Sequence, residues 1–341
     1  MPTTHIWLLD RGGPEDAAGV QPWLETLARD PSTSPLPGWM VFLLAWVWSH
    51  WAARRVAPVC RRIGGAAPQL SDTREQARIL KQLLGRRYAV HPVFRHGGES
   101  MAAALAAMPS GDQVVLLPLH PQRHPAATRA ALDDAWRRLS DADHPTAEIE
   151  GWGNEPGLVA LLARRTREAL IDLQKHGPTG LVLAAAAPPR PGSAAADAYL
   201  AELAETATHL RDHLHFRGPV VQAWVPALSD TVAPTPDPLT AVRICTAKGA
   251  RSIIVVPLGC TTSWPELRTI QATDIQLQAQ LSAVHVLPPL APSPDFARLL
   301  AQLIRRAERG AGWHVPEDDL RQHVENELRA AGHRLVAGEA S

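Results

Sequence analysis

Cysteine, net charge and long apolar runs are all scarce in this chain of 341 residues. Its three cysteines, Cys60, Cys245 and Cys260, lie far apart, which argues against a disulfide framework, a CxxC redox pair or a closed zinc site. Lysine plus arginine and aspartate plus glutamate both number 34, so the chain as a whole has no field that would attract nucleic acid. It also has no basic stripe with interleaved aromatics, and we expect no nucleic-acid partner.

A dinucleotide-binding loop and a secretory signal are missing as well. The first expected strand is followed by Gly12-Gly13-Pro14 rather than by GxGxxG, and Pro14 lacks the backbone N–H that a phosphate would need. The N-terminus has no basic segment followed by an apolar core, so we expect a cytoplasmic protein. The apolar run 39–48 has ten residues, short of the ~20 that a membrane-spanning helix needs.

Short apolar runs alternate with amphipathic stretches along most of the chain. Runs that are apolar throughout suit strands buried on both faces of a parallel sheet. Strands are predicted near residues 5–10, 89–94, 113–119, 147–151, 179–185, 219–224, 252–257 and 283–287. Helices are predicted at 73–84, 126–139, 156–174, 194–214, 239–248 and 294–309. This alternation indicates an α/β protein with right-handed crossovers.

A break near residues 175–178 (KHGP) divides the predicted strands into two sets of four. We therefore expect two similar Rossmann-like lobes, residues 1–175 and 176–310, each a four-stranded parallel sheet flanked by helices. Ligands of such folds bind outside the carboxyl ends of the strands, so an interlobe cleft is the expected site. The charged tail, residues 311–341 with a predicted helix at 317–335, should pack on the outside.

Several short motifs follow one another along the chain. They are LLDRGGPE (8–15), RRIGGAAP (61–68), FRHG (94–97), LLPLHPQ (116–122) and IEGW (149–152). In order and spacing they resemble L-L-N-x-G-G/T-P-E, R-x-I-G-G-x-S-P, F/M-R-Y-G, L-P-L-Y-P-Q-Y-S and I-D-x-W of the ferrochelatases. The similarity runs over residues 5–305, so the chain resembles the class II tetrapyrrole chelatases.

This resemblance implies a two-lobed protein of haem biosynthesis that needs no cofactor and takes a porphyrin and Fe(II) as substrates. Two pyrrole N–H protons must leave as the metal enters, and a neutral imidazole accepts protons well near neutral pH. By resemblance, the residues expected around the porphyrin are Arg11, Trp39, Phe42, Leu43, Trp46, Arg95, His120 and Gln222.

The family's catalytic histidine follows the fifth strand, in F-S-x-H-G/S-L/I-P. The corresponding run here is LAAAAPP, residues 183–189, which places Ala186 at the histidine position. A methyl group can neither accept a proton nor bind a metal, so this position has lost its chemistry.

The family's acidic motif, V-P-x-x-F-T/V-S-D-x-x-E-T-L-x-E-I, corresponds to VPLGCTTSWPELRTI, residues 256–270. Counting forward from its first residue places Glu266 on the catalytic glutamate, whereas aligning backward from the next leucine places Pro265 there. The first register also puts Asp274 where the family often has another carboxylate. Ser263 replaces the family's aspartate, so the acidic motif is thinned.

Three histidines stand where the family has Tyr or Ser: His96, His120 and His124. Together with Glu266 and Asp274 they suggest a substitute site for a divalent metal ion. The alternative is that these histidines face solvent or pack in the core.

Residues 38–53 contain four of the eleven tryptophans, and arginines follow at once. A Trp-rich apolar segment next to basic residues is typical of a helix that lies in a membrane interface. The resemblance makes this stretch a lip of the active site, and we expect residues 38–62 to contact a membrane surface peripherally. The alternative is an ordinary buried helix.

Three functions remain open. The first is a ferrochelatase-like protein that binds a porphyrin with weak or lost Fe(II) insertion, serving as a carrier, a sensor or a partner of an authentic haem-pathway enzyme. The second is an active chelatase with rearranged His and Glu ligands, and the third is an unrelated α/β binding protein. Ala186 favours the first, because loss of a general base typically costs roughly 10²–10⁴-fold in rate.

Overall fold

The computed structural model describes residues 3–32, 38–188, 192–225, 235–263 and 281–311. The predicted tail helix at 317–335, and with it nearly all of the tail 311–341, lies outside these residues. The same holds for Glu266 and Asp274.

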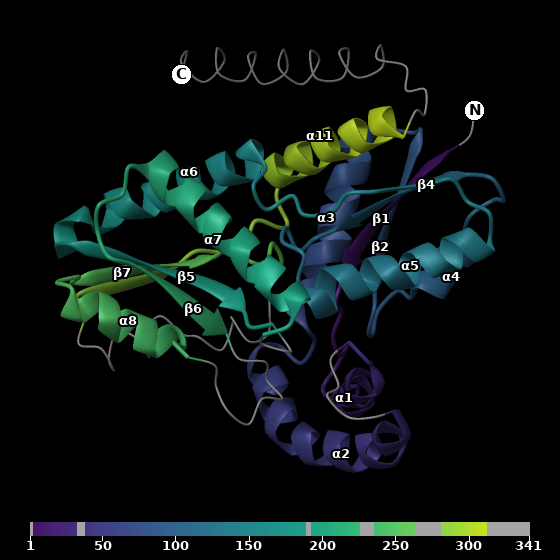
Figure 1. Ribbon diagram of the computed structural model, residues 1–341, viewed down its shortest axis with the longest axis horizontal. Coiled ribbons are helices and arrows are strands. Elements are labelled where there is room, and N and C mark those ends of the chain that lie inside the picture. The colour runs from purple at the N-terminus through teal and green to yellow at the C-terminus, as the bar shows by residue number, and fades with distance from the viewer. Residues whose placement is uncertain (1–2, 33–37, 189–191, 226–234, 264–280, 312–341) are drawn as a thin grey trace, which may run out of the picture.

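Two four-stranded sheets, parallel throughout, form the centre of the two lobes (Figure 1). The first has the order β2-β1-β3-β4 and the second the order β6-β5-β7-β8, so the lobes share one topology. The strands are β1 (Thr4–Asp10), β2 (Tyr88–Phe94), β3 (Gln113–Pro118), β4 (Thr146–Glu148), β5 (Thr179–Ala186), β6 (Val220–Val225), β7 (Ser252–Pro257) and β8 (Ala283–Val286). The predicted α/β class and all eight predicted strands are confirmed.

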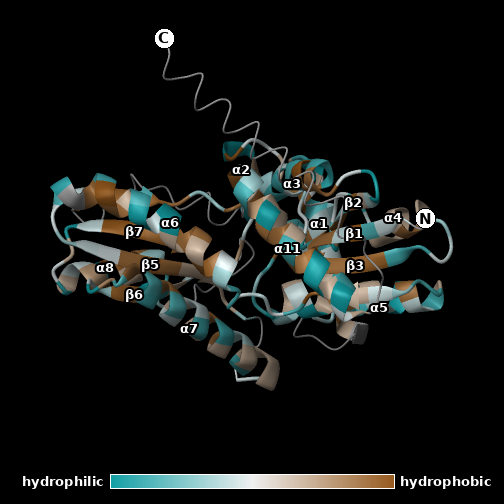
Figure 2. Cartoon of the chain, turned by 90° about the horizontal axis from the view of Figure 1, so that it is seen from above, coloured by the Kyte–Doolittle hydropathy of each residue, from teal (hydrophilic) through white to brown (hydrophobic). Residues whose placement is uncertain are grey.

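Helices cover both faces of each sheet, and Figure 2 shows apolar strands between helices with polar outer faces. They are α1 (Val20–Arg29), α2 (Gly38–Arg62), α3 (Pro68–Leu84), α4 (Met101–Ala106), α5 (Ala130–Asp141), α6 (Pro156–Leu173), α7 (Ala194–Leu214), α8 (Pro238–Ala247) and α11 (Pro294–Gly310). Ser193, Asp237 and Ser293 each accept a backbone N–H as N-caps of α7, α8 and α11. The helix predicted at 126–139 is divided into a short π turn, Pro125–Arg129, and α5.

Two helices cover the lobe other than the one to which the predicted boundaries assign them. Helix α6 precedes residue 175 in sequence but packs on α7 and β7 of the second lobe. Helix α11 ends the second half of the chain but packs on α3, β3 and β4 of the first lobe (Figure 1). The lobes therefore exchange helices in space, although the sequence divides near residue 175.

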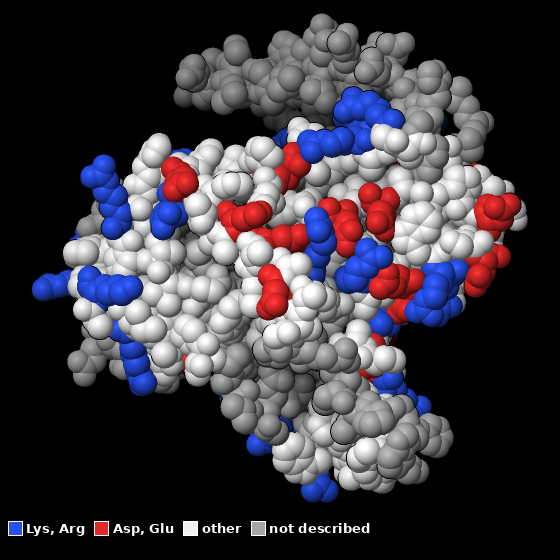
Figure 3. All heavy atoms as spheres, in the orientation of Figure 1, with Lys and Arg blue, Asp and Glu red and all other residues white. Residues whose placement is uncertain are grey.

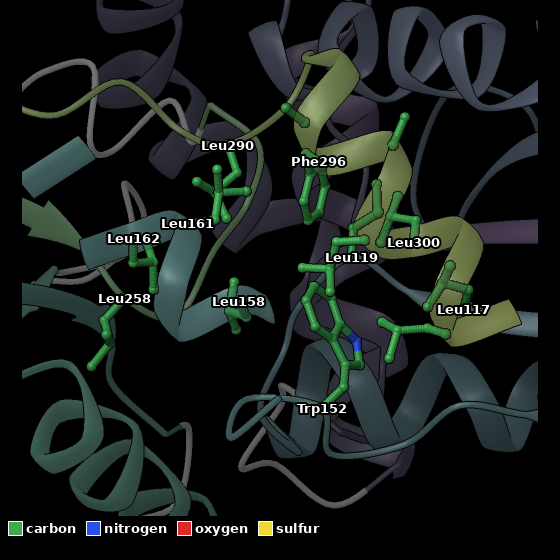
Figure 4. Close-up of a cluster of buried hydrophobic side chains, with 14 of the residues drawn as sticks. Leu117, Leu119, Trp152, Leu158, Leu161, Leu162, Leu258, Leu290, Phe296 and Leu300 are labelled. Atoms are coloured by element: carbon green, nitrogen blue, oxygen red, sulfur yellow. The ribbon is translucent and has the colours of Figure 1, made fainter. Parts of the chain in front are cut away.

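One continuous apolar core passes from lobe to lobe. In Figure 4, Leu119 and Leu300 lie beside Trp152 and Phe296, and leucines of α6 lie between this pair and the loop residue Leu258. The Trp152 and Phe296 rings lie 6.1 Å apart, and the Trp152 indole donates to the carbonyl of Pro118 at 3.0 Å. Because this core is shared, the carboxyl ends of the two sheets are held at a fixed junction.

Candidate functional site

The loop after β7 contacts the carboxyl ends of the first sheet. The Thr261 hydroxyl donates to the carbonyl of Leu119 at 2.6 Å, and the Thr262 hydroxyl donates to Asp10 Oδ2 at 3.0 Å. The backbone N–H of Ser263 donates to Asp72 Oδ2 at 2.8 Å. Thr261–Ser263, all buried, therefore form an interlobe clasp that ties the second lobe to the first.

Asp10, the last residue of β1, is the buried carboxylate at the centre of this junction, with 1% of its surface exposed. Its Oδ1 accepts the N–H of Arg11 at 2.7 Å, and its Oδ2 accepts the hydroxyls of Thr73 and Thr262. Burial raises the pKa of Asp10, and these donors oppose the rise. Three donors thus fix the carboxylate in one orientation.

His120 follows β3 by two residues and lies beside Asp10, with 3.9 Å between His120 Nδ1 and Asp10 Oδ1. The imidazole is 4% exposed. Burial, reinforced by the charge of Arg11, lowers the pKa of His120 to about 3. The ring is therefore neutral at physiological pH, because burial disfavours the imidazolium.

His124 is the N-cap residue of the π turn. Its Nδ1 accepts the N–H groups of Ala126 and Ala127 at 3.2 and 3.1 Å, so the ring proton lies on Nε2. Nε2 lies 3.3 Å from the carbonyl of Ala187, to which it donates. Tyr199 packs edge-on against this ring and donates to the carbonyl of Ala186 at 2.9 Å. The two side chains together hold the backbone after β5.

Arg95 and His96, which follow β2, converge on Asp30 at the end of α1. The Arg95 guanidinium lies 2.6 Å from Asp30, donates to Ser32 at 2.7 Å and pairs with Asp134 of α5 at 2.8 Å. His96 Nε2 lies 2.9 Å from Asp30 Oδ2. Burial raises the pKa of Asp30, but the bonds from His96 and Ser32 and the charge of Arg95 outweigh it and bring the pKa to about 2. These side chains join α1 to the first sheet.

The predicted metal site of His96, His120, His124, Glu266 and Asp274 stays a prediction, because its two carboxylates lie outside the described residues. The described part of the chain contains no group of three or more His, Cys, Asp or Glu side chains arranged to hold a metal ion. Both ring nitrogens of His124 bond the backbone, and His96 is engaged by Asp30, so the imidazoles do not converge.

The Trp-rich segment forms one helix of 25 residues, α2, which projects below the sheets together with α1 (Figure 1). Its inner side packs on α1, and Trp48 belongs to this contact. Its outer side exposes Leu44, Trp46, Val47 and Trp51. The side chains of Trp39, Phe42 and Leu43 are not described. The segment therefore has a packed face and an exposed apolar face, and its contact with a membrane stays a prediction.

Of the other predicted porphyrin contacts, Arg11 lies over the ring of Trp23 at 6.0 Å, near the start of α1. Gln222 is partly exposed on β6, where its amide donates to the carbonyl of Ala223 at 3.3 Å. The structure thus brings Arg11 and His120 together at the junction and leaves Arg95 in the contact with α1. Their contact with a porphyrin stays a prediction.

Sequence reasoning missed Asp10, Thr73 and Thr262 as parts of the site. One signal was visible, because Asp10 stands where the family opening L-L-N has asparagine. Nothing in the local pattern indicates that Thr262, 252 positions further along, reaches the same carboxylate.

The family model and the curated relatives name the same family. The model of the ferrochelatase family matches residues 3–308. Curated ferrochelatases of Thermosynechococcus vestitus and Synechococcus sp. strain RCC307 are both 28% identical, covering 89% and 94% of this chain and 82% and 85% of their own. That of Geobacter metallireducens is 24% identical over 89% of this chain and 98% of its own.

A solved structure of CbiX, titled as the terminal enzyme of sirohaem biosynthesis in denitrifying bacteria, is 17% identical, with a TM-score of 0.45, over 89% of this chain and 99% of that one. The family match spans both lobes, the clasp and the exchanged helix α11. The chain therefore belongs to the ferrochelatase family.

Proposed function

We propose that this protein binds a porphyrin at the junction of its lobes and inserts Fe(II) more weakly than its relatives, if it inserts the metal at all. This proposal rests mainly on Ala186, which ends β5 at the position of the family's histidine. Its methyl group packs against the core of the second lobe, and its carbonyl accepts the Tyr199 hydroxyl. Strand β5 thus supplies no base to the junction.

Binding of free porphyrin is the first expected outcome. Titration of the protein with protoporphyrin and with coproporphyrin should shift their absorbance and fluorescence with submillimolar affinity, because an apolar ring gains by leaving water for the junction and the α2 lip. Spectra that do not change at saturating protein would refute the proposal.

Addition of Zn²⁺ or Fe(II) to the porphyrin complex separates the remaining alternatives. Slow or absent spectral conversion to the metalloporphyrin supports a carrier, a sensor or a partner of an authentic haem-pathway enzyme. Conversion at the rate of other ferrochelatases would instead support an active chelatase with rearranged groups.

A peripheral membrane contact through α2 belongs to the same proposal. Trp46 and Trp51 are 58% and 47% exposed on one side of the helix, and the guanidinium of Arg55 lies 4.4 Å over the Trp51 ring. The helix carries arginines and no acidic residue, and Figure 3 shows basic but hardly any acidic side chains where this region projects. Exposed indoles beside arginines fit the headgroup region of an anionic bilayer. Among the described residues, no helix is long and apolar enough to cross a membrane.

Replacing Trp46 and Trp51 by Ser is expected to abolish most binding to vesicles that contain anionic lipid, measured by co-sedimentation. The matched control is Trp48→Ser, which removes an indole from the packed side of the same helix. The control should lower the melting temperature and keep vesicle binding. Equal binding by the double variant and the parent would contradict a membrane role for α2.

A further inference from the structure

A histidine and an aspartate lie together at the ends of two neighbouring strands. Asp10 ends β1 and His120 follows β3, and these strands pair in parallel, so both side chains emerge at the edge of the first sheet that faces the second lobe. Nδ1 of His120 lies 3.9 Å from Oδ1 of Asp10. A shift of about 1 Å would close this distance to a charge-assisted hydrogen bond.

The carboxylate is held ready for such a partner. Thr73 of α3 and Thr262 of the interlobe clasp both donate to Oδ2, and the Arg11 N–H donates to Oδ1. Residues from both lobes thus orient one carboxylate toward one imidazole. A buried, ordered His–carboxylate pair at the ligand-binding edge of a fold is typical of acid–base sites.

Both members of the pair are departures from the family pattern. Asp10 stands in place of the asparagine of L-L-N, and His120 in place of the tyrosine of L-Y-P. The imidazole lost from the second lobe at Ala186 is therefore matched by an imidazole gained on the first lobe, across the same junction.

We propose that His120 is the proton acceptor of this protein, and that Asp10 is the residue that positions it; this assignment depends on the porphyrin function proposed above. Nε2 of His120 takes a proton from a pyrrole N–H of the bound porphyrin, and the freed nitrogen pair bonds the entering divalent metal. Asp10 Oδ1 then accepts the Nδ1–H of the imidazolium. The second pyrrole proton leaves after His120 has passed the first to water, so two protons are released for each metal inserted.

His124 and His96 do not fit this role. The two backbone N–H groups on His124 Nδ1 and the carbonyl at its Nε2 fix that ring as a structural cap. His96 is bonded to Asp30, away from the clasp. Of these three histidines, only His120 adjoins a carboxylate that residues of both lobes orient.

The test is single-turnover insertion of Zn²⁺ into protoporphyrin bound by excess protein, followed by absorbance. His120→Ala should slow insertion at least ~10-fold while the protoporphyrin dissociation constant stays unchanged. Free imidazole should restore much of the rate to His120→Ala, and the parent measured with the same imidazole corrects for zinc chelation. The matched control is His144→Gln. His144 is a buried histidine that bonds the carbonyl of Asp112 at the amino ends of the strands, away from the junction. This variant should insert Zn²⁺ at the rate of the parent protein.

Asp10→Asn provides a second variant if His120→Ala does not fold. It keeps an oxygen for the threonine hydroxyls but cannot stabilise an imidazolium, so we expect slower insertion with unchanged porphyrin affinity. Parent-like rates in both variants, weaker porphyrin binding, or loss of rate without rescue by imidazole would overturn the assignment.

The experiments distinguish failure of the proposed porphyrin function from failure of the role assigned to His120. A parent protein that binds no porphyrin refutes the proposed function. A parent protein that binds porphyrin but inserts Zn²⁺ no faster than free solution refutes only the role of His120.

Discussion

Replacing Arg95 by Ala is expected to lower the free energy of unfolding by about 3 kcal/mol or more, which is typical of breaking a buried ion pair. Asp30 has only 2% of its side chain exposed, and Arg95 supplies its closest positive charge, at 2.6 Å. Without the guanidinium, Asp30 keeps a buried charge that His96 and Ser32 compensate only in part, and Asp134 loses its tie to β2. Urea unfolding followed by tryptophan fluorescence measures the change.

On acidification, the Arg95→Ala variant should unfold at a higher pH than the parent protein does. The folded-state pKa of Asp30, about 2, is below its ordinary value, so its contribution to stability is present above about pH 4 and is lost as the pH falls toward 2. Removing Arg95 raises the folded-state pKa of Asp30. The difference between this pKa and the ordinary value becomes smaller, and so does the contribution of Asp30 to stability. The control is Arg306→Ala, which breaks an exposed pair with Glu155 and should change stability far less, because water already screens that pair. Equal effects of the two variants would show that the Asp30 cluster does not anchor α1.

Replacing Ala186 by His is expected to raise the rate of metal insertion by roughly tenfold or more, as a positioned general base does. The backbone at this place is held by the Tyr199 hydroxyl on the Ala186 carbonyl and by His124 on the Ala187 carbonyl, so the new ring starts from a fixed point. We expect partial rather than full recovery, because Ser263 has also replaced the family's aspartate and a base about 1 Å out of place loses much of its effect.

The matched control is Ala187→His, one residue further along. If the alignment that places Ala186 at the histidine position is correct, the shifted imidazole should give no gain in single-turnover Zn²⁺ insertion. A gain at residue 187 alone would move the alignment by one position. A parent rate equal to that of the family's other members, with no gain from Ala186→His, would contradict the proposal of weakened insertion.

The strands could be predicted from the sequence because a strand buried on both faces appears as a short continuous apolar run. Every residue of β1 and of β7 is buried, and each strand has an uninterrupted apolar centre, Ile6–Leu9 in β1 and Ile253–Val256 in β7. The exchange of α6 and α11 between the lobes has no such local sequence pattern. An amphipathic stripe shows that a helix packs on something, but it does not show on which of two similar sheets it packs.

The candidate site was only partly predictable for a related reason. His124 looks like a metal ligand when residue types alone are read, yet its place directly before Pro125, at the start of a helical turn, makes it a cap. The bonds from Thr73 and Thr262 to Asp10 join residues 63 and 252 positions away, and no local pattern predicts a pairing over such separations. Spacing finds motifs, whereas the network that orients their side chains depends on the packed lobes.

The exchange of α6 and α11 also restricts how the molecule can move. A hinge requires two bodies joined by a few adjustable residues, but here each lobe is covered in part by a helix that the other half of the chain provides. Swinging the sheets apart would separate Thr262 from Asp10 and pull the leucines of both helices from their shared core. The low-cost motion is a shear, in which packed surfaces slide by small amounts past one another. A planar ligand bound at the junction, as proposed above, would then enter and leave while the two sheets stay nearly stationary.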